Sequence, residues 1–137
     1  MRYMIIVKAT HDSEAGVMPE EPLLTAMAGY HEALMRAGVL LDASGLKPSA
    51  HGWRIRYRGS TRDVTDGPFT GGTDMIAGYT LIQVNSREEA LEWTRRFPNP
   101  AGEGVEAEIE VRQLFELDDF APGEAIDRFR AMDAGAS

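Results

Sequence analysis

Residues 2–9 read Arg-Tyr-Met-Ile-Ile-Val-Lys-Ala, and they indicate the kind of fold more clearly than any other stretch. The segment is rich in β-branched and aromatic residues and lacks Gly and Pro, so it predicts a buried strand. Residues 76–84 predict a central strand, and residues 106–112 alternate between charged and apolar side chains. Such alternation is typical of a strand with one face on a core and the other in water.

Two helical patterns lie between these strands. In residues 22–37 apolar side chains recur at steps of four, three and four, and Gly38 supplies a stop signal. A second predicted helix begins at Ser86, where Glu89 three residues later completes a capping box, and it ends before Pro98. The predicted core stripe of the first helix consists of Leu23, Met27, Tyr30 and Leu34.

The middle of the chain predicts a hairpin and a loop. Residues 53–58 alternate aromatic or aliphatic residues with three arginines, which predicts a half-buried strand with one basic face. Residues 62–65 form the returning strand after a Gly-Ser turn signal, and residues 66–74, with three glycines and one proline, predict an irregular loop. The polar segment 10–21 is also expected to be a loop, and residues 39–46 could form a short strand.

The order of the elements predicts the fold class. A third helix is expected near Pro122, with Ile126, Phe129 and Met132 on one side. Two helices shared among several strands predict an α+β fold with both helices on one face of an antiparallel sheet. The other face of such a sheet is bare and a partner could cover it, so we expect a homodimer.

Composition excludes several classes of protein. The 137 residues are 43% hydrophobic and 26% charged, which fits one globular domain. Cysteine is absent, which excludes disulfides and cysteine-ligated metals. Of the net charge of −8, residues 102–137 carry −7, which argues against a nucleic-acid partner, and a solvated acidic face that keeps the protein soluble is the default explanation for it. Apolar runs are too short for a membrane span or a signal peptide, so we expect a cytoplasmic protein with no membrane partner.

Familiar catalytic motifs are missing, so individual polar residues are the candidates. The sequence has no phosphate-binding loop, dinucleotide fingerprint, nucleophile elbow or HExxH motif, and we expect neither a metal nor a cofactor. His31 lies beside the core stripe of the first helix, where it suits general acid–base work or is a hydrogen-bonded boundary residue. Asp66 opens the Gly/Pro loop and is either functional or a turn residue.

Aromatic and basic residues complete the candidate set. Four aromatic side chains could line a ligand pocket, with core packing the alternative for most of them: Trp53, Tyr57, Phe69 and Tyr79. Three arginines could hold an anionic ligand or form a solvated strand face: Arg54, Arg56 and Arg58.

Several short motifs together resemble the YCII-related family, also called the DGPF family. The tetrapeptide Asp66-Gly67-Pro68-Phe69, followed by Gly78-Tyr79, is similar to the family signature. The first strand and the pair Tyr30-His31 also match, as do residues 37–40, 45–46, 90–93 and 110–112. The resemblance implies a ferredoxin-like sheet in a dimeric α+β barrel. Residues 1–117 would form this domain and residues 118–137 a C-terminal helical extension.

The resemblance also implies a histidine–aspartate site in the cleft between sheet and helix. The histidine falls on His31, and Asp66 is the nearest match for the carboxylate, so we expect these two to be the catalytic pair. Ligand contacts are expected from Trp53, Arg54, Phe69, Asp74 and Tyr79. One departure matters: the family loop DGPFAETKE continues here as Thr-Gly-Gly-Thr-Asp, so the usual Glu becomes Gly71 and the usual Lys becomes Thr73. An activity that needs that lysine is therefore in doubt.

Two classes of function follow, and the sequence leaves them open. In the first, Asp66 orients His31, which moves a proton on a small cyclic or aromatic molecule without an organic cofactor, in a lyase, isomerase or hydrolase step. In the second, the protein is a non-catalytic small-molecule-binding or regulatory dimer whose polar groups only orient the ligand. A purely structural dimer would explain the fold but not a Gly-rich loop beside ionisable groups.

Overall fold

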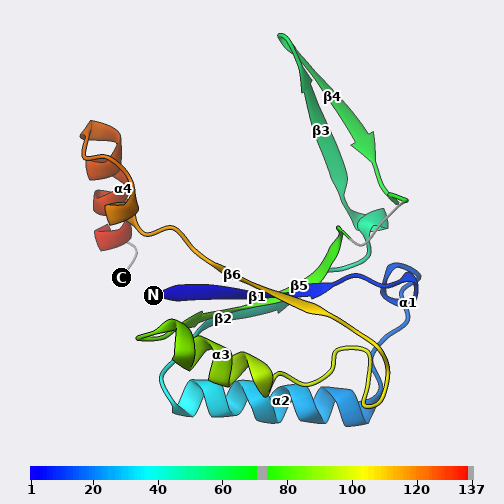
Figure 1. The fold of residues 1–137 in the computed structure, drawn as a ribbon. Coiled ribbons are helices and arrows are strands. Elements are labelled where there is room, and N and C mark those ends of the chain that lie inside the picture. Colours follow the sequence, from blue (N-terminus) through cyan, green and yellow to red (C-terminus); the bar gives the residue numbers. More distant parts are fainter. Residues whose placement is uncertain (71–73, 136–137) are drawn as a thin grey trace.

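The computed structural model describes residues 1–70 and 74–135 (Figure 1). The departure from the family loop at Gly71 and Thr73 therefore lies outside the described residues. Four strands form one antiparallel sheet in the order β2-β5-β1-β6, with β1 at Arg2–Lys8, β2 at Leu40–Gly45, β5 at Ile76–Gln83 and β6 at Ile109–Gln113. Helix α2 (Glu21–Arg36) follows β1 and helix α3 (Arg87–Arg95) follows β5. This is a ferredoxin-like arrangement, and it confirms the predicted α+β class.

Both α2 and α3 cover the same face of the sheet, as predicted (Figure 1). Along β1, Tyr3 and Ile5 are buried, whereas Met4 and Ile6, which point to the other face, are only half-buried. The predicted stripe of α2 also faces inward, because its members are buried or half-buried. The core consists of Tyr3, Ile5, Tyr30, Leu34, Val39, Ile82, Val84 and Ala90.

Strands β3 (Trp53–Arg58) and β4 (Thr61–Asp66) form a separate hairpin that rises away from the sheet (Figure 1). The predicted hairpin is confirmed, but the prediction of a half-buried strand is wrong, because every residue of both strands is exposed. Core packing does not apply to its aromatic residues, since Trp53 and Tyr57 are each 65% exposed. The reason lies in the topology: β2 pairs directly with β5, so the hairpin between them is a side branch with no layer against it.

Two local predictions near helix ends need correction. Residues 10–21, expected to form a loop, contain the short helix α1 (His11–Glu14). The helix begins where the side chains of Thr10 and Ser13 each accept a hydrogen bond from the other residue's backbone N–H. At α3, the Ser86 hydroxyl accepts from the Glu89 N–H as expected. The Glu89 carboxylate, however, accepts from the N–H of Asn85 and not of Ser86.

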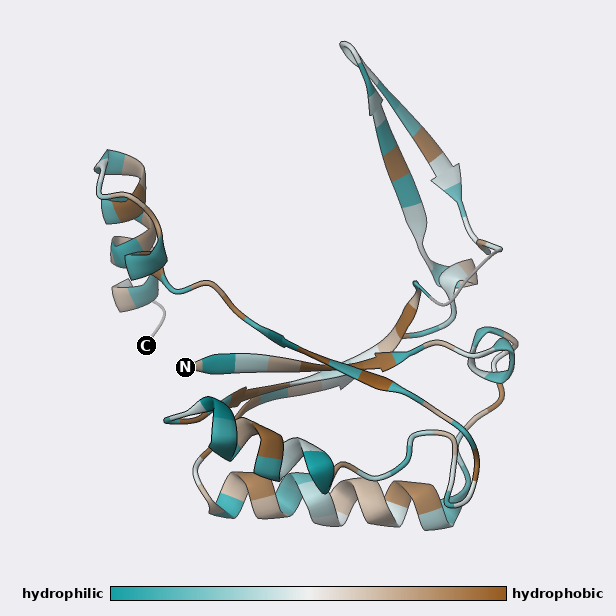
Figure 2. Ribbon diagram, viewed as in Figure 1, coloured by the Kyte–Doolittle hydropathy of each residue, from teal (hydrophilic) through white to brown (hydrophobic). Residues whose placement is uncertain are grey.

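The hairpin and the C-terminal helix flank the open face of the sheet. Helix α4 (Glu124–Gly135) confirms the third predicted helix, and it follows a short 3-10 turn at Leu117–Asp119. In Figure 1 the hairpin stands at one end of the sheet and α4 at the other, both on the side away from α2 and α3. Figure 2 shows apolar residues recurring along both of these projections. Within the described ranges, no helix has the length and apolar character needed to cross a membrane.

Candidate functional site

His31 is held between α2 and the sheet by two hydrogen bonds. Its Nδ1 lies 2.7 Å from the Met27 carbonyl oxygen, and its Nε2 lies 2.8 Å from the Thr80 hydroxyl on β5. A carbonyl oxygen only accepts, so Nδ1 carries the hydrogen, and in the neutral ring Nε2 accepts the Thr80 proton. Both ring nitrogens therefore have partners inside the protein.

Aromatic rings pack around this histidine. The ring of Tyr30 contacts His31 and Phe97 edge-on, at centroid distances of 5.5 and 5.2 Å. The Tyr30 hydroxyl donates to the Trp93 carbonyl oxygen at 2.8 Å. Burial raises the pKa of Tyr30 to about 12, against a smaller opposing effect of Arg96, so the phenol stays protonated at neutral pH. The surroundings of His31 are thus a packed part of the α2–α3 layer.

Asp66 occupies a different part of the molecule. It is the last residue of β4, opposite Trp53 at the base of the hairpin, and it is exposed. Among the described residues no hydrogen bond or ion pair involves its carboxylate, and none joins it to His31. The catalytic pairing of His31 with Asp66 therefore stays a prediction.

The loop that begins at Asp66 is held by a serine that the sequence did not single out. Ser49 lies in the 3-10 turn Ser49–His51 that precedes β3, and its hydroxyl donates to a Glu14 carboxylate oxygen and accepts from the Phe69 N–H. The Ser49 N–H donates to the other Glu14 oxygen at 3.0 Å, and these hydrogen bonds lower the pKa of Glu14. Gly67 is necessary here, because a Cβ would lie 1.9 Å from the Ser49 carbonyl oxygen.

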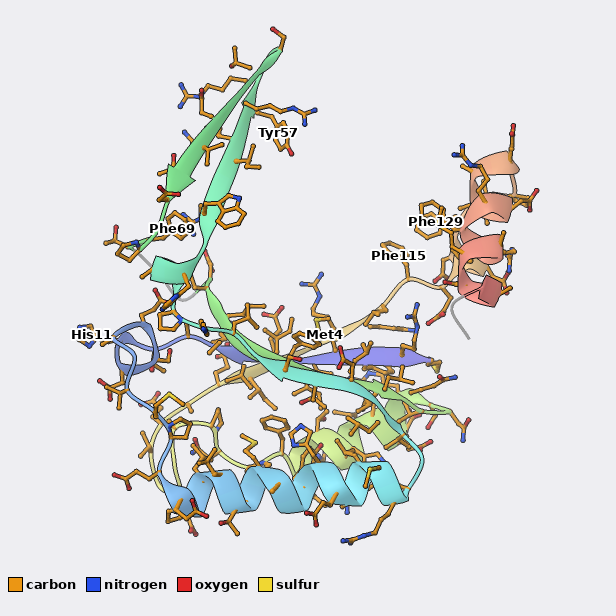
Figure 3. All side chains as sticks on the ribbon, turned by 180° about the vertical axis from the view of Figure 1, so that it is seen from behind. Met4, His11, Tyr57, Phe69, Phe115 and Phe129 are labelled. Atoms are coloured by element: carbon orange, nitrogen blue, oxygen red, sulfur yellow. The ribbon has the colours of Figure 1, made fainter. Side chains whose placement is uncertain are left out.

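The open face of the sheet carries a central apolar strip. Register places Met4 opposite Leu81 and Ile6 opposite Tyr79. Residues opposite each other in an antiparallel pair share a face, so these four side chains lie together. Tyr79, a predicted ligand contact, therefore lies on the open face, where its hydroxyl donates to the Asp42 carboxylate at 2.8 Å. Figure 3 shows Met4 between the hairpin and the C-terminal segment.

An open cleft of about 260 Å³ lies at one end of this face. It is lined by Ile6, Lys8, Asp74, Ile76 and Glu110. The Lys8 ammonium lies 2.8 Å from Glu108 and 3.6 Å from Glu110. The hydrogen bond to Glu108 is the main cause that raises the pKa of Lys8, so the cleft holds a permanent cation. Asp74, a predicted ligand contact, is among the residues that line this cleft. We call it the Lys8 cleft, after its cation.

A second cleft, of about 270 Å³, lies on the arginine face of the hairpin. Its lining consists of Arg54, Arg56, Arg58, Asp63, Thr65 and Phe69. The guanidinium of Arg54 stacks 3.9 Å from the centre of the Phe69 ring, so two predicted ligand contacts meet here. Trp53 is adjacent to Arg54 in β3 and therefore points to the other face of the hairpin.

The predicted residues thus divide among three places: the helix-covered layer, the open face and the hairpin. Sequence reasoning missed Thr80, although a signal for it exists. In β5, alternation puts Thr80 on the same side as Ile82, and a polar group on a buried face needs a partner. In the described part of the chain, no cluster of three or more His, Asp or Glu residues could hold a metal ion.

Comparison with known proteins identifies the family of the chain. The family model of the YCII-related domain matches residues 1–115. That range includes the whole sheet, both covering helices and the hairpin, and it ends before α4. No curated protein matches the chain.

Proposed function

Because the chain belongs to the YCII-related domain family, we propose that it is a homodimeric small-molecule-binding protein whose ligand occupies the Lys8 cleft. The lining of the cleft is the observation that carries the proposal, since two isoleucines stand beside one cation and two carboxylates. Ligand pockets are typically apolar, with a few polar groups that orient the ligand. The isoleucines favour a small cyclic or aromatic molecule, and the opposed charges favour one that bears both a donor and an anionic or acceptor group.

A second copy of the chain is needed to enclose such a ligand. The cleft holds about 260 Å³ and is open, whereas enclosed ligand pockets hold roughly 300–1,000 Å³. Large exposed apolar side chains flank the same face, with Tyr57 on the hairpin and Phe115 and Phe129 at the other end (Figure 3). These exposed apolar side chains on both sides of the open face favour a partner that covers them. A second sheet laid over the open face would bury these side chains and close the cleft.

The hydrogen bonds of His31 favour binding over catalysis. A general base needs a free lone pair within reach of the substrate proton. In the neutral ring the lone pair of Nε2 accepts from Thr80, which is buried. His31 then positions α2 against β5, while Lys8, Asp74 and Glu110 orient the ligand.

Proton transfer by His31 is the second candidate function, and the bond to Thr80 is what favours it. An imidazole hydrogen-bonded to a hydroxyl is the arrangement in which a proton can pass between the two groups. A substrate hydroxyl that displaced Thr80 would meet the same lone pair. In this alternative Asp66 approaches His31 and stabilises its protonated form.

Ligand-observed NMR tests the binding function. Wild type, Lys8→Gln and Lys47→Gln are each screened against one set of small cyclic and aromatic acids and amino acids. The chain has only these two lysines, and Lys47 is exposed, so Lys47→Gln is a matched control for charge. We expect hits whose saturation-transfer signal is lost in Lys8→Gln and kept in Lys47→Gln. Hits that bind both variants equally would place the ligand elsewhere.

Two further measurements separate the alternatives. Sedimentation equilibrium should give twice the mass of one chain, and a monomer at all concentrations would contradict the dimer. NMR of the His31 ring in wild type and Asp66→Asn tests the catalytic pair. The binding function predicts the same His31 ring signals in both proteins, whereas signals that move in Asp66→Asn would support proton transfer.

A further inference from the structure

The outer face of the β3–β4 hairpin gathers positive charge. Arg54, Arg56 and Arg58 alternate along β3, so their side chains leave the same face about 7 Å apart. Thr65 lies opposite Arg54 in the register, and Asp63 lies opposite Arg56. We propose that this arginine cleft binds a small multiply charged oxyanion of the phosphate-ester or pyrophosphate class.

The charges on this face are not balanced within the chain. Asp63 is the one acidic residue that lines the cleft, and its carboxylate lies 3.9 Å from the Arg58 guanidinium, at the edge of ion-pair distance. In the described residues Arg56 makes no ion pair at all. Like charges at this spacing repel, so the face is most stable when an anion lies between them.

One of the three arginines is already positioned for a ligand. Arg54 stacks on the ring of Phe69, and the Phe69 N–H is bound by the Ser49 hydroxyl. A guanidinium stacked through its plane keeps its N–H edges free to donate. Phe69, in the loop that starts at Asp66, therefore holds the Arg54 side chain in place. Arg54 then loses less conformational freedom when an anion binds.

The geometry selects the class of ligand. Two or three guanidinium groups offer several parallel N–H donors, and phosphoryl groups present enough oxygens to accept from more than one of them. The Thr65 hydroxyl, on the same face, adds a donor of the kind that phosphate oxygens accept. A single carboxylate has one charge and two oxygens, so it balances less of the charge of these guanidinium groups than a phosphoryl anion does. A nucleic-acid strand is disfavoured because residues 102–137 carry a net charge of −7.

This site is independent of the function proposed above. The opposite face of the hairpin carries Trp53, Ile55 and Tyr57, and this apolar face is the one that a second copy would cover in the proposed dimer. Arg62 lies opposite Tyr57 on that same face, with its guanidinium 4.9 Å from the centre of the Tyr57 ring. It therefore offers a control on the same hairpin that removes the same charge from the other side.

Titration with pyrophosphate at constant ionic strength tests the proposal. Backbone and arginine Nε–H NMR signals are followed in wild type, Arg56→Gln and Arg62→Gln. We expect saturable shifts at Arg54, Arg56 and Thr65, an affinity roughly tenfold lower in Arg56→Gln, and a change of less than about twofold in Arg62→Gln. In a parallel titration sulfate should bind more weakly than pyrophosphate, and equal affinity for the two anions would overturn the assignment to the phosphoryl class.

Several outcomes would overturn the proposal. Equal weakening in Arg56→Gln and Arg62→Gln would mean that the anion senses only overall charge. Shifts that never saturate, or that map to residues outside the arginine cleft, would also exclude the site. The substituted side chains are exposed, so both variants should fold, which urea unfolding verifies. Lys8→Gln should bind pyrophosphate like wild type, so failure of this site and failure of the Lys8 cleft are distinguishable.

Discussion

The helix-covered face of the sheet and the β3–β4 hairpin are both made of antiparallel strands with alternating side chains, yet they differ in burial. Ile5 and Ile82 are fully buried beneath α2 and α3. In the hairpin, the same alternation separates an apolar face from an arginine face, and neither is covered. Alternation determines which residues share a face, but burial depends on whether another layer packs against that face.

The difference assigns distinct roles to the two regions. The buried core of the described residues lies in the sheet, its helices and the residues that directly flank β2 and β5, so this region carries most of the folding free energy. The hairpin adds exposed surface to the chain, and an isolated hairpin is only marginally stable in water. Its sequence is therefore better explained by the two contacts proposed above, with a second copy on one face and with an anion on the other.

The largest expected difference between the two regions is the loss in the free energy of unfolding caused by matched truncations. Ile5→Ala should lower the free energy of unfolding by about 2–5 kcal/mol, because Ile5 is fully buried and leaves a cavity. Ile55→Ala removes the same atoms from the hairpin, where the side chain is 44% exposed, and should cost less than about 1 kcal/mol in dilute solution. Urea unfolding measures both values.

Protein concentration sharpens this test. If a second copy covers the hairpin, the cost of Ile55→Ala should grow as the concentration rises, because dimerisation adds to apparent stability. The cost of Ile5→Ala in the isolated chain is independent of that interface. Equal losses in both variants at the lowest concentration would mean that the hairpin is packed within one chain, and would break the comparison.

A pair of glycine substitutions is expected to have the next largest effect. Gly67→Ala places a methyl group 1.9 Å from the Ser49 carbonyl oxygen, so the base of the hairpin must shift, at a cost of about 1–3 kcal/mol. Gly29 lies in α2, and a methyl group added there would meet nothing within 4 Å apart from its chain neighbours and the backbone of its own helix, so Gly29→Ala should stabilise the protein by about 0.5–1 kcal/mol. Thermal unfolding should therefore show shifts of opposite sign, and a neutral Gly67→Ala would refute the close approach.

The hydroxyl of Thr80 offers a smaller and more specific test within the covered layer. Thr80→Val keeps the shape but leaves His31 Nε2 without its partner, which should cost about 1–2 kcal/mol. Thr80→Ser keeps the hydroxyl and should retain most of that hydrogen-bond contribution. Nitrogen-15 NMR of the imidazole checks the bond directly, because the neutral ring should carry its hydrogen on Nδ1 in wild type.

Elements that depend on local sequence patterns can be predicted from the sequence, whereas features that depend on contacts between distant segments cannot. The sequence predicts α2 and β5 closely because their signals, steps of three or four and alternation, are local and strongly periodic. Helix α1 is four residues long and gives no periodic signal. The exposure of Trp53 and Tyr57 depends on the direct pairing of β2 with β5, a contact between distant segments that no local pattern encodes.

The candidate site shows the same limit. The residues themselves identify Arg54 and Phe69 as candidates, and the structure stacks them. The partner of His31, by contrast, is 49 positions away. Nothing in the sequence around Ser49 marks it as the residue that holds the loop after β4, because its acceptor, the Glu14 carboxylate, comes from a turn of helix 35 positions earlier.

That contact between Glu14 and Ser49 supports the last and smallest prediction, a pH dependence confined to the hairpin base. Hydrogen bonds from Ser49 lower the folded-state pKa of Glu14, so the stability they add is complete above the ordinary glutamate pKa and is lost as pH falls through the lowered value. Hydrogen exchange at the Phe69 amide should therefore speed up on acidification in wild type, after correction for intrinsic rates, while core amides such as that of Ile5 stay protected. Glu14→Gln should remove the pH dependence and leave exchange at Phe69 uniformly faster. If Phe69 and Ile5 responded to pH alike, the hairpin base would unfold together with the sheet, and the two regions would be one cooperative unit.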